Sequence, residues 1–262
     1  MGLQQLNFAG LNKIEVSIMR LREFEPPEGY YLAFSGGKDS EVVYDLAVKS
    51  GVKFDAHFNV TTVDPPEVLK FIRENYPNVE WHYPDKNMYQ LVIEKGYPQR
   101  QSRFCCEELK EHGGEGRFVL TGIRAAESNK RAQRLMVELC TKGLGKKFLH
   151  PIIDWSAWER KGKKGGEVWE YIQTSRLPYC KLYDEGFKRI GCVLCPMSSA
   201  KQAQKDLTRF PKIARAWRIA FEHLWNKHTE GTEKFPSPEV MWKRWLSRKG
   251  QGKDTGQCSM FV

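Results

Sequence analysis

Residues 30–40 read Tyr30-Tyr31-Leu32-Ala33-Phe34-Ser35-Gly36-Gly37-Lys38-Asp39-Ser40. Apolar residues run from Tyr31 to Phe34 directly into Ser-Gly-Gly, and an amphipathic pattern opens at Asp39, so we expect a buried strand, a tight turn and the start of a helix. The two glycines can expose backbone N–H groups, Ser35 and Ser40 add hydroxyls, and Lys38 adds a full positive charge. Together with the partial positive charge of a helix N-terminus, this stretch predicts a cradle for phosphate groups.

The spacing of this loop differs from that of a Walker loop, in which four residues separate the first glycine from Gly-Lys-Ser/Thr. The hexapeptide Ser35-Gly36-Gly37-Lys38-Asp39-Ser40 instead resembles the PP-loop of the adenine-nucleotide α-hydrolase-like enzymes. That resemblance implies binding of ATP or of adenylyl conjugates, with chemistry at the α-phosphate. The alternative is a glycine-rich turn that carries a solvated lysine.

Composition indicates a globular chain with one sizeable core, since 40% of the 262 residues are hydrophobic. No apolar run approaches the roughly 18–20 residues that span a bilayer, and residues 1–6 lack the features of a secretion signal. We therefore expect a cytoplasmic protein with no membrane partner, whose seven cysteines are reduced thiols, metal ligands or catalytic groups. The formal charge of +10 favours anionic partners, from nucleotides to nucleic acid.

The order of elements predicts an α/β fold with a doubly wound, mainly parallel sheet. Helices are expected at residues 3–24, from Asp39, at 66–76 and at 87–95, and strands at 31–34, 53–60, 79–83 and 116–122. Because ligands of such sheets bind at the carboxyl ends of the strands, Thr61 to Asp64 should lie near the ligand. Beyond residue 150 the chain becomes rich in tryptophan, and residues 210–228 predict a long amphipathic helix.

Cysteines form a second pattern. Cys105 and Cys106 are adjacent and precede a helical pattern, and Cys192 and Cys195 form a later Cys-x-x-Cys. Two such turns can bring four thiolates together, and sulfur ligands in a reducing compartment suit zinc or an iron–sulfur cluster. Cys180 is a fifth candidate ligand. The alternatives are a redox pair at the Cys-x-x-Cys and buried, inert thiols at Cys105 or Cys106.

These motifs occur in the order found in the adenylyl-sulfate and phosphoadenylyl-sulfate (APS and PAPS) reductase family, which the chain resembles over residues 28–200. The motifs are the phosphate loop, the Cys-Cys pair, residues 121–128 (TGIRAAES), and residues 177–195, which end in the Cys-x-x-Cys. The resemblance implies a [4Fe-4S] cluster bound by Cys105, Cys106, Cys192 and Cys195. The reductases generally have no cysteine at the position of Cys180, which we keep as a substitute ligand for Cys105 or Cys106. The resemblance also implies phosphates at Ser35 to Ser40, adenosine near Thr61 to Asp64, and the sulfo group facing Arg124 with Lys130 or Arg131.

The placement of Arg124 also follows from the strand pattern. Thr121-Gly122 ends a predicted strand, so Gly122, Arg124 and Glu127 should lie at the same sheet edge as the phosphate loop. A guanidinium there can grip oxyanions with two hydrogen bonds. The alternative is a surface ion pair between Arg124 and Glu127.

Five segments follow from this interpretation. They are an N-terminal helix at 1–27, a PP-loop nucleotide-binding domain at 28–150, a substrate- and cluster-binding segment of that domain at 151–200, a Trp-rich helical region at 201–249 and a tail at 250–262. The tail carries Cys258 in the sequence Gly256-Gln257-Cys258-Ser259, whereas family reductases attack sulfur with a cysteine in a Glu-Cys-Gly tail. Cys258 is therefore either the catalytic nucleophile or a free thiol.

The leading hypothesis is thiol-dependent cleavage of APS or PAPS to sulfite and AMP or adenosine 3′,5′-bisphosphate. Lys38, Arg124 and the loop amides would neutralise the anion, Cys258 would attack sulfur, and a thioredoxin-like protein would supply reducing thiols. The rival is an ATP pyrophosphatase, with Mg²⁺, that activates a nucleic acid for sulfur transfer as in DNA phosphorothioation or tRNA thiolation. Residues 242–249 and the basic loop at 161–164 would then contact the phosphate backbone and the bases. A nucleotide-sensing module with a structural cluster is the third, non-enzymatic possibility.

Overall fold

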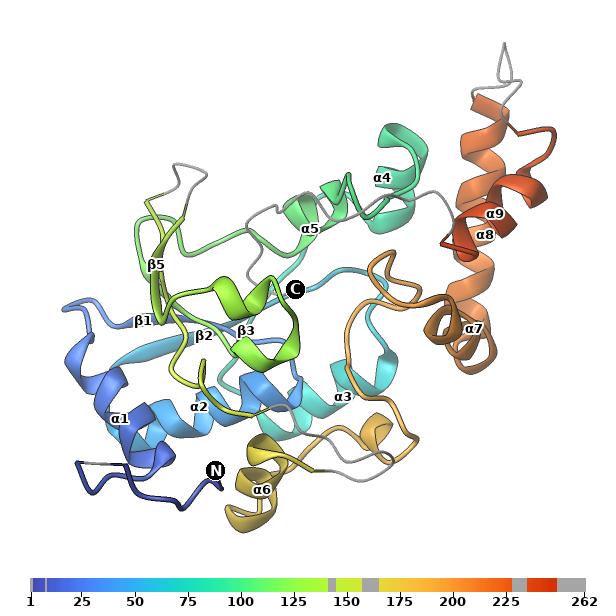
Figure 1. The fold of residues 1–262 in the computed structure, drawn as a ribbon. Helices are drawn as coiled ribbons and strands as arrows, with labels where there is room; N and C mark the ends of the chain where they lie inside the picture. Colours follow the sequence, from blue (N-terminus) through green and yellow to red (C-terminus); the bar gives the residue numbers. More distant parts are fainter. Residues whose placement is uncertain (1, 8, 141–144, 157–164, 228–234, 249–262) are drawn as a thin grey trace.

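The computed structural model describes residues 2–7, 9–140, 145–156, 165–227 and 235–248 (Figure 1). In these residues a single sheet has the strand order β3-β2-β1-β4-β6-β5, and β5 pairs with β6 in the antiparallel direction while the other neighbours are parallel. The predicted mainly parallel, doubly wound sheet is thus confirmed. The strands are β1 (Tyr30–Ala33), β2 (Phe54–Asn59), β3 (Glu80–His82), β4 (Phe118–Leu120), β5 (Val137–Leu139) and β6 (Lys147–Leu149).

Helices connect the strands and extend the chain beyond the sheet. In the view of Figure 1, α2 and α3 lie below the sheet, α4 and α5 lie above it, and α7 to α9 stand to one side, where α8 packs against α4. The α-helices are α1 (Lys13–Glu23), α2 (Lys38–Ser50), α3 (Pro66–Asn75), α4 (Met88–Lys95), α5 (Phe104–Leu109), α6 (Glu167–Thr174), α7 (Ala200–Arg209), α8 (Pro211–Lys227) and α9 (Pro238–Leu246). Short 3₁₀ turns are η1 (Ala125–Glu127), η2 (Arg131–Gln133) and η3 (Lys181–Tyr183).

Strand order reverses at β1. From β1 the chain passes through α2 to β2 on one side, whereas β4 pairs with β1 on the other side. The loops after β1 and β4 therefore open at the same sheet edge, between strands whose connections run in opposite directions. This is the position at which open α/β sheets bind their ligands.

The two faces of the sheet belong to hydrophobic clusters of different size. Alternate residues of a strand point to opposite faces, so Tyr30 and Leu32 enter the large core formed with α2 and α3, and Tyr31 and Ala33 point the other way. On that second face, Tyr31, Ala33, Val119 and Phe148 form a small separate cluster.

One prediction of secondary structure needs correction, and one pair of strands is missing from the predictions. The N-terminal helix begins at Lys13 rather than near residue 3, because Asn12 accepts hydrogen bonds from the N–H groups of Ile14 and Glu15 and so caps the helix. Gly10 has a φ of 74°, which a helix does not allow. The hairpin of β5 and β6 was not predicted, since strands of three residues carry too little alternation to be recognised.

The helical C-terminal region buries the two tryptophans of α9. Trp242 and Trp245 stack on each other, and both rings contact Phe221 of α8. They are 5% and 1% exposed, so neither ring is available to stack on a nucleic acid base. The basic loop at 161–164 lies outside the described residues. No helix in the described ranges is both long and apolar enough to cross a membrane.

Candidate functional site

The predicted phosphate loop joins β1 to α2. Gly36 has a φ of 64°, a backbone conformation that favours glycine. A β-carbon there would also lie 2.8 Å from the side chain of Ile72, so this position of the turn requires glycine for both reasons. Gly37 is the N-cap of α2, which places the amide end of this helix at the loop. The hydroxyl of Ser40 donates to the Gly37 carbonyl at 2.8 Å and lies 3.1 Å from the hydroxyl of Ser35. The loop therefore has the shape of an anion cradle.

Lys38 and Asp39 begin the helix inside this cradle. The Lys38 side chain is 3% exposed, and its ammonium lies 3.1 Å from the Asp39 carboxylate. The backbone N–H of Lys38 donates to the hydroxyl of Tyr183 at 3.0 Å. A cation held this deeply can act on a bound phosphate with little screening by water.

Arg124 supports Asp39 from the neighbouring strand end. Its Nε donates to Asp39 Oδ1 at 2.8 Å, and its Nη1 donates to the carbonyl of Ser156 at 2.8 Å. Burial alone would raise the pKa of Asp39, but Lys38 and Arg124 outweigh it and hold the pKa below its usual range. The surface ion pair considered for Arg124 is excluded, since the side chain is 4% exposed. Arg124 thus positions Asp39 from behind the cradle.

Gly122 allows the two strand ends to meet. A β-carbon at Gly122 would lie 2.8 Å from the backbone carbonyl carbon of Asp39, so any larger residue would push the start of α2 away. Glu127 also lines the cradle, and its carboxylate accepts the backbone N–H of Arg124 at 3.2 Å. As predicted, the structure places Gly122, Arg124 and Glu127 beside the phosphate loop.

Two further arginines line the cradle itself. Arg131 contacts Glu127 through an ion pair, and Arg189 reaches the cradle from the segment before the Cys-x-x-Cys. Burial, the charges of Arg189 and Arg124, and that of Arg134 lower the pKa of Arg131 to about 9, although Asp39 opposes the shift. Such crowding of positive charge favours an anion at this place. Lys130, the other residue considered with Arg124, is exposed, and Arg189 was not predicted.

His150 stabilises the strand end behind Gly122. It is fully buried, and its Nδ1 lies 2.6 Å from the hydroxyl of Thr121. Burial, with the charges of Arg134 and Arg131, lowers the pKa of His150 to about 3.

We expect this histidine to make folding sensitive to acid. Because the unfolded chain binds the proton near pH 6.5 and the folded chain only near pH 3, its contribution is complete above pH 6.5 and is lost as the pH falls. Relative to His150→Gln, the wild-type free energy of unfolding should fall by about 1.4 kcal/mol per pH unit below pH 6. Urea unfolding at pH 7, 6, 5 and 4 measures the difference. The same dependence of the unfolding free energy on pH in the wild type and in His150→Gln would contradict this prediction.

The segment after β2 lies next to the phosphate loop. Asp64 accepts the backbone N–H of Thr61 at 2.6 Å, which closes a tight turn after the strand. Asp64 lines a hollow with Phe34, Phe58 and Val68. Apolar walls with a carboxylate at one side suit a nucleoside, so Asp64 is where the resemblance places adenosine. Thr61 instead contacts the Cys192 sulfur at 3.4 Å.

Four cysteines line one cavity of about 350 Å³. Cys105 and Cys106 lie on α5, whereas Cys192 and Cys195 lie in a loop held by Arg248, which donates to the carbonyls of Leu194 and Cys195 at 3.1 and 3.0 Å. The two cysteine motifs therefore lie together, as predicted. Whether these thiols bind a metal remains a prediction.

Among the four cysteines of this cavity, Cys106 is the one whose pKa is lowered. The hydrogen bond with Cys106, together with burial, raises the pKa of Cys105, and burial raises the pKa of Cys192 and Cys195. A hydrogen bond from Cys105 lowers the pKa of Cys106, with help from Lys110 and Arg103, although burial opposes the shift. Burial alone would lower the pKa of Lys110, but Cys192, Asp64 and the other sulfurs raise it. Lys110 thus places a positive charge beside the sulfurs, and Cys106 is the cysteine of this cavity that loses its proton most readily.

The remaining cysteines lie elsewhere. Cys180 is 1% exposed and packs in the large core, where burial and the charges of Glu41 and Glu67 raise its pKa to about 11. The residues around the four-cysteine cavity do not include Cys180, so its predicted use as a substitute ligand has no support in this arrangement. Cys258, the predicted nucleophile, lies outside the described residues.

The cradle and the four-cysteine cavity adjoin. Arg189 and Ile190 line both, and Ile190 also lines the hollow that contains Asp64. The segment 188–191 therefore forms a shared wall between a phosphate site and a group of thiols. An anionic group attached to a phosphate in the cradle would lie at this wall.

Comparison with known proteins identifies relatives of this chain. The family described as "Phosphoadenosine phosphosulfate reductase domain" matches residues 29–198. An uncharacterised protein of Methanocaldococcus jannaschii is 33% identical over 217 residues, which cover 76% of this chain and 43% of that protein. An adenosine 5′-phosphosulfate reductase of Oceanobacillus iheyensis is 27% identical over 175 residues, 62% of this chain and 69% of that enzyme. The chain spans less than half the length of its archaeal relatives.

Among solved structures, PAPS reductase from Candida auris in complex with phosphate has a similar fold. The TM-score is 0.50 at 20% sequence identity, over 71% of this chain and 90% of that one. At this identity the likeness concerns the fold alone.

Proposed function

Because the chain belongs to the phosphoadenosine phosphosulfate reductase domain family, we propose that it is a PP-loop enzyme that reduces a sulfonucleotide. The substrate is adenylyl sulfate or phosphoadenylyl sulfate, and the products are sulfite and AMP or adenosine 3′,5′-bisphosphate. The observation that carries this proposal is the wall at Arg189 and Ile190, common to the phosphate cradle and the four-cysteine cavity. A sulfo group on the α-phosphate would extend from the cradle toward that wall.

The cradle residues would bind and orient the nucleotide. Lys38 and the first amides of α2 would neutralise the α-phosphate, and Arg131 and Arg189 would face the sulfo oxygens. Arg124 would act through Asp39, which it holds at 2.8 Å. Fixed positive groups of this kind stabilise the charge that develops on the leaving nucleotide.

Cys258 is the proposed nucleophile. Its thiolate attacks the sulfur atom and forms an S–S bond, while the bond from sulfur to the phosphate oxygen breaks and the nucleotide leaves with the electron pair. A thiol of a thioredoxin-like protein then attacks the Cys258 sulfur, and sulfite leaves. A second thiol of the reductant closes a disulfide and frees Cys258, so the dithiol is oxidised and the sulfo group is reduced.

The four cysteines fit an iron–sulfur cluster better than a single zinc ion. Tetrahedral zinc would bring its sulfur ligands to about 3.8 Å from one another, yet among the described residues no three cysteine sulfurs come within 4.8 Å of each other. A four-iron cube binds one cysteine on each iron and so needs wider spacing. Cys105, Cys106, Cys192 and Cys195 would hold it, and it would supply a fixed electrostatic field beside the sulfo group.

One observation favours a second candidate, an ATP pyrophosphatase that adenylates a nucleic acid for sulfur transfer. The carboxylates of Asp39 and Glu127 both line the cradle, and carboxylates beside phosphates are typical ligands of Mg²⁺. A nucleotide with three phosphates needs such an ion more than a sulfonucleotide does.

Product analysis separates the two candidates. Anaerobically purified protein is incubated with adenylyl sulfate or phosphoadenylyl sulfate plus thioredoxin, and separately with ATP and Mg²⁺, and sulfite, AMP and pyrophosphate are quantified. We expect sulfite from a sulfonucleotide, lost in Cys258→Ser and retained in Cys140→Ser. Pyrophosphate from ATP without sulfite would replace the reductase by the second candidate, and sulfite release by Cys258→Ser at the wild-type rate would exclude Cys258 as nucleophile.

A further inference from the structure

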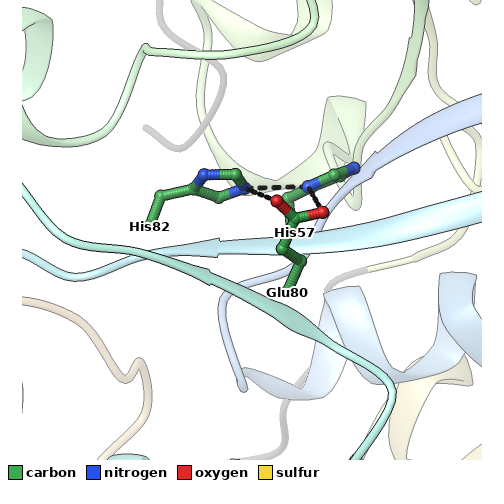
Figure 2. A group of neighbouring side chains, drawn as sticks. All are labelled: His57, Glu80 and His82. Atoms are coloured by element: carbon green, nitrogen blue, oxygen red, sulfur yellow. Dashed lines mark hydrogen bonds and ion pairs between the residues drawn. The ribbon is translucent and has the colours of Figure 1, made fainter.

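A group of three polar side chains lies on the face of the sheet that carries Tyr31 and Ala33, apart from the cradle and the cysteines. His57 belongs to β2, and Glu80 and His82 belong to the edge strand β3 (Figure 2). In the parallel register His57 is paired with Glu80 and Asn59 with His82. Glu80 and His82 are two residues apart on one strand, so both point to the same face as His57.

The three side chains converge. His57 Nδ1 lies 2.8 Å from His82 Nε2 and 3.5 Å from Glu80 Oε2, and His82 Nε2 lies 3.8 Å from Glu80 Oε1 (Figure 2). Ligands at about 2.0–2.1 Å from a tetrahedral zinc ion are separated by about 3.3 Å. The observed separations bracket that value.

The other side of the His57 ring is fixed by a chain of partners. Its Nε2 contacts Asp55, and Arg117 grips both oxygens of Asp55 at 2.6 Å. Since a carboxylate paired in this way only accepts hydrogen bonds, Nε2 carries the hydrogen and Nδ1 presents its lone pair to His82 and Glu80. The carboxylate–histidine arrangement is the one that orients histidine ligands of metals. Tyr31 stacks on the ring with centroids 4.0 Å apart and further restricts it.

Charge and exposure agree with a cation. The positive charge of Arg117 neutralises the negative charge of Asp55. The negative charge of Glu80 can therefore balance a bound cation. The His57 side chain is 8% exposed, whereas those of Glu80 and His82 are 64% and 38% exposed, so the site opens to solvent on one side. Two imidazoles and one carboxylate suit zinc better than Mg²⁺ or Ca²⁺, which prefer oxygen ligands.

We propose that His57, Glu80 and His82 bind a zinc ion, with water at the fourth position. The ion would fasten the edge strand β3, which has three residues, to β2. This site is independent of the proposed reaction, because its ligands are neither cradle nor cavity residues.

The test uses the full chain as purified, after dialysis against a chelator, with Zn²⁺ alone as the probe. Isothermal titration should find one zinc ion bound by the wild type and by His223→Ala, a control at an exposed histidine of α8. His82→Ala and Glu80→Gln should lose this ion, and Asp55→Asn should bind it about 10–100-fold more weakly. Glu80→Gln changes an exposed side chain, so its fold should be intact even if His82→Ala is unstable.

Zinc-edge X-ray absorption identifies the ligands, and iron does not interfere with it. We expect nitrogen and oxygen neighbours at about 2.0–2.1 Å in the wild type. Sulfur neighbours at about 2.3 Å would place the ion at the cysteines instead. That result, an absence of zinc binding, or unchanged binding in both His82→Ala and Glu80→Gln would overturn the proposal and leave a hydrogen-bonded histidine pair.

Discussion

Replacing Lys38 by methionine should lower kcat/KM for the nucleotide by about 10²–10³-fold, the effect expected when one preorganised charge stabiliser is removed. Methionine keeps most of the length of the side chain, so it fills the space beside Asp39 while removing the charge. The Lys38 side chain is 3% exposed, so water cannot replace the missing ammonium easily. Initial rates over a range of substrate concentrations measure the loss, with sulfite or pyrophosphate as the product.

Lys49→Met is the matched control. Lys49 lies at the other end of the same helix, and its ammonium contacts Asp45 at 2.7 Å and Tyr171 at 2.9 Å. Its removal should leave kcat/KM within about twofold of the wild type, since the interactions of a partly exposed ion pair are weak. If Lys38→Met kept most of the wild-type kcat/KM, the loop would not be the phosphate site, whichever product the enzyme forms.

The phosphate loop could be predicted because its constraints are local. A positive φ at Gly36, the helix start at Lys38 and the hydroxyl of Ser40 all follow from neighbouring residues. The same holds for α8, whose predicted limits of residues 210–228 agree with Pro211–Lys227 because the pattern is long and strongly periodic. Where the sequence pattern covers only three residues, as in β5 and β6, pairing with a neighbouring strand determines the local structure, and the sequence alone does not show that pairing.

The parts of the site that sequence reasoning missed depend on distant contacts. Arg189 lies within the motif at residues 177–195, but nothing in that motif marks this arginine, and only the fold places it at the wall between the cradle and the four-cysteine cavity. His57 belongs to a stretch that predicts a core strand, and only the register of β2 with β3 places it beside Glu80 and His82. Five cysteines are candidates for one metal site in the sequence, and only the folded chain shows that four of them line one cavity without Cys180.

Cys192→Ser should abolish binding of iron and with it the activity that depends on the intact cavity. Serine replaces a soft sulfur by a hard oxygen, which iron–sulfur clusters rarely accept as a ligand. Cys192 lies in the loop that Arg248 and Asp206 hold at the cavity, so its loss removes one corner of the predicted four-cysteine set. Anaerobic purification followed by iron and sulfide analysis and Mössbauer spectroscopy would measure the change.

Cys180→Ser is the control that gives this experiment its meaning. Cys180 is buried, like Cys105 and Cys106, and carries the same sulfur, but it lies beside Glu41 and Glu67 and does not line the four-cysteine cavity. We expect Cys180→Ser to lose stability, since a hydroxyl replaces a buried thiol, and yet to retain the wild-type content of iron per folded chain. Equal loss of iron in Cys192→Ser and Cys180→Ser would indicate that Cys180 is also a ligand of the cluster. Full iron in Cys192→Ser would mean that the four thiols do not share a cluster, and the wall at Arg189 would then separate the nucleotide from a redox-active or structural group of cysteines.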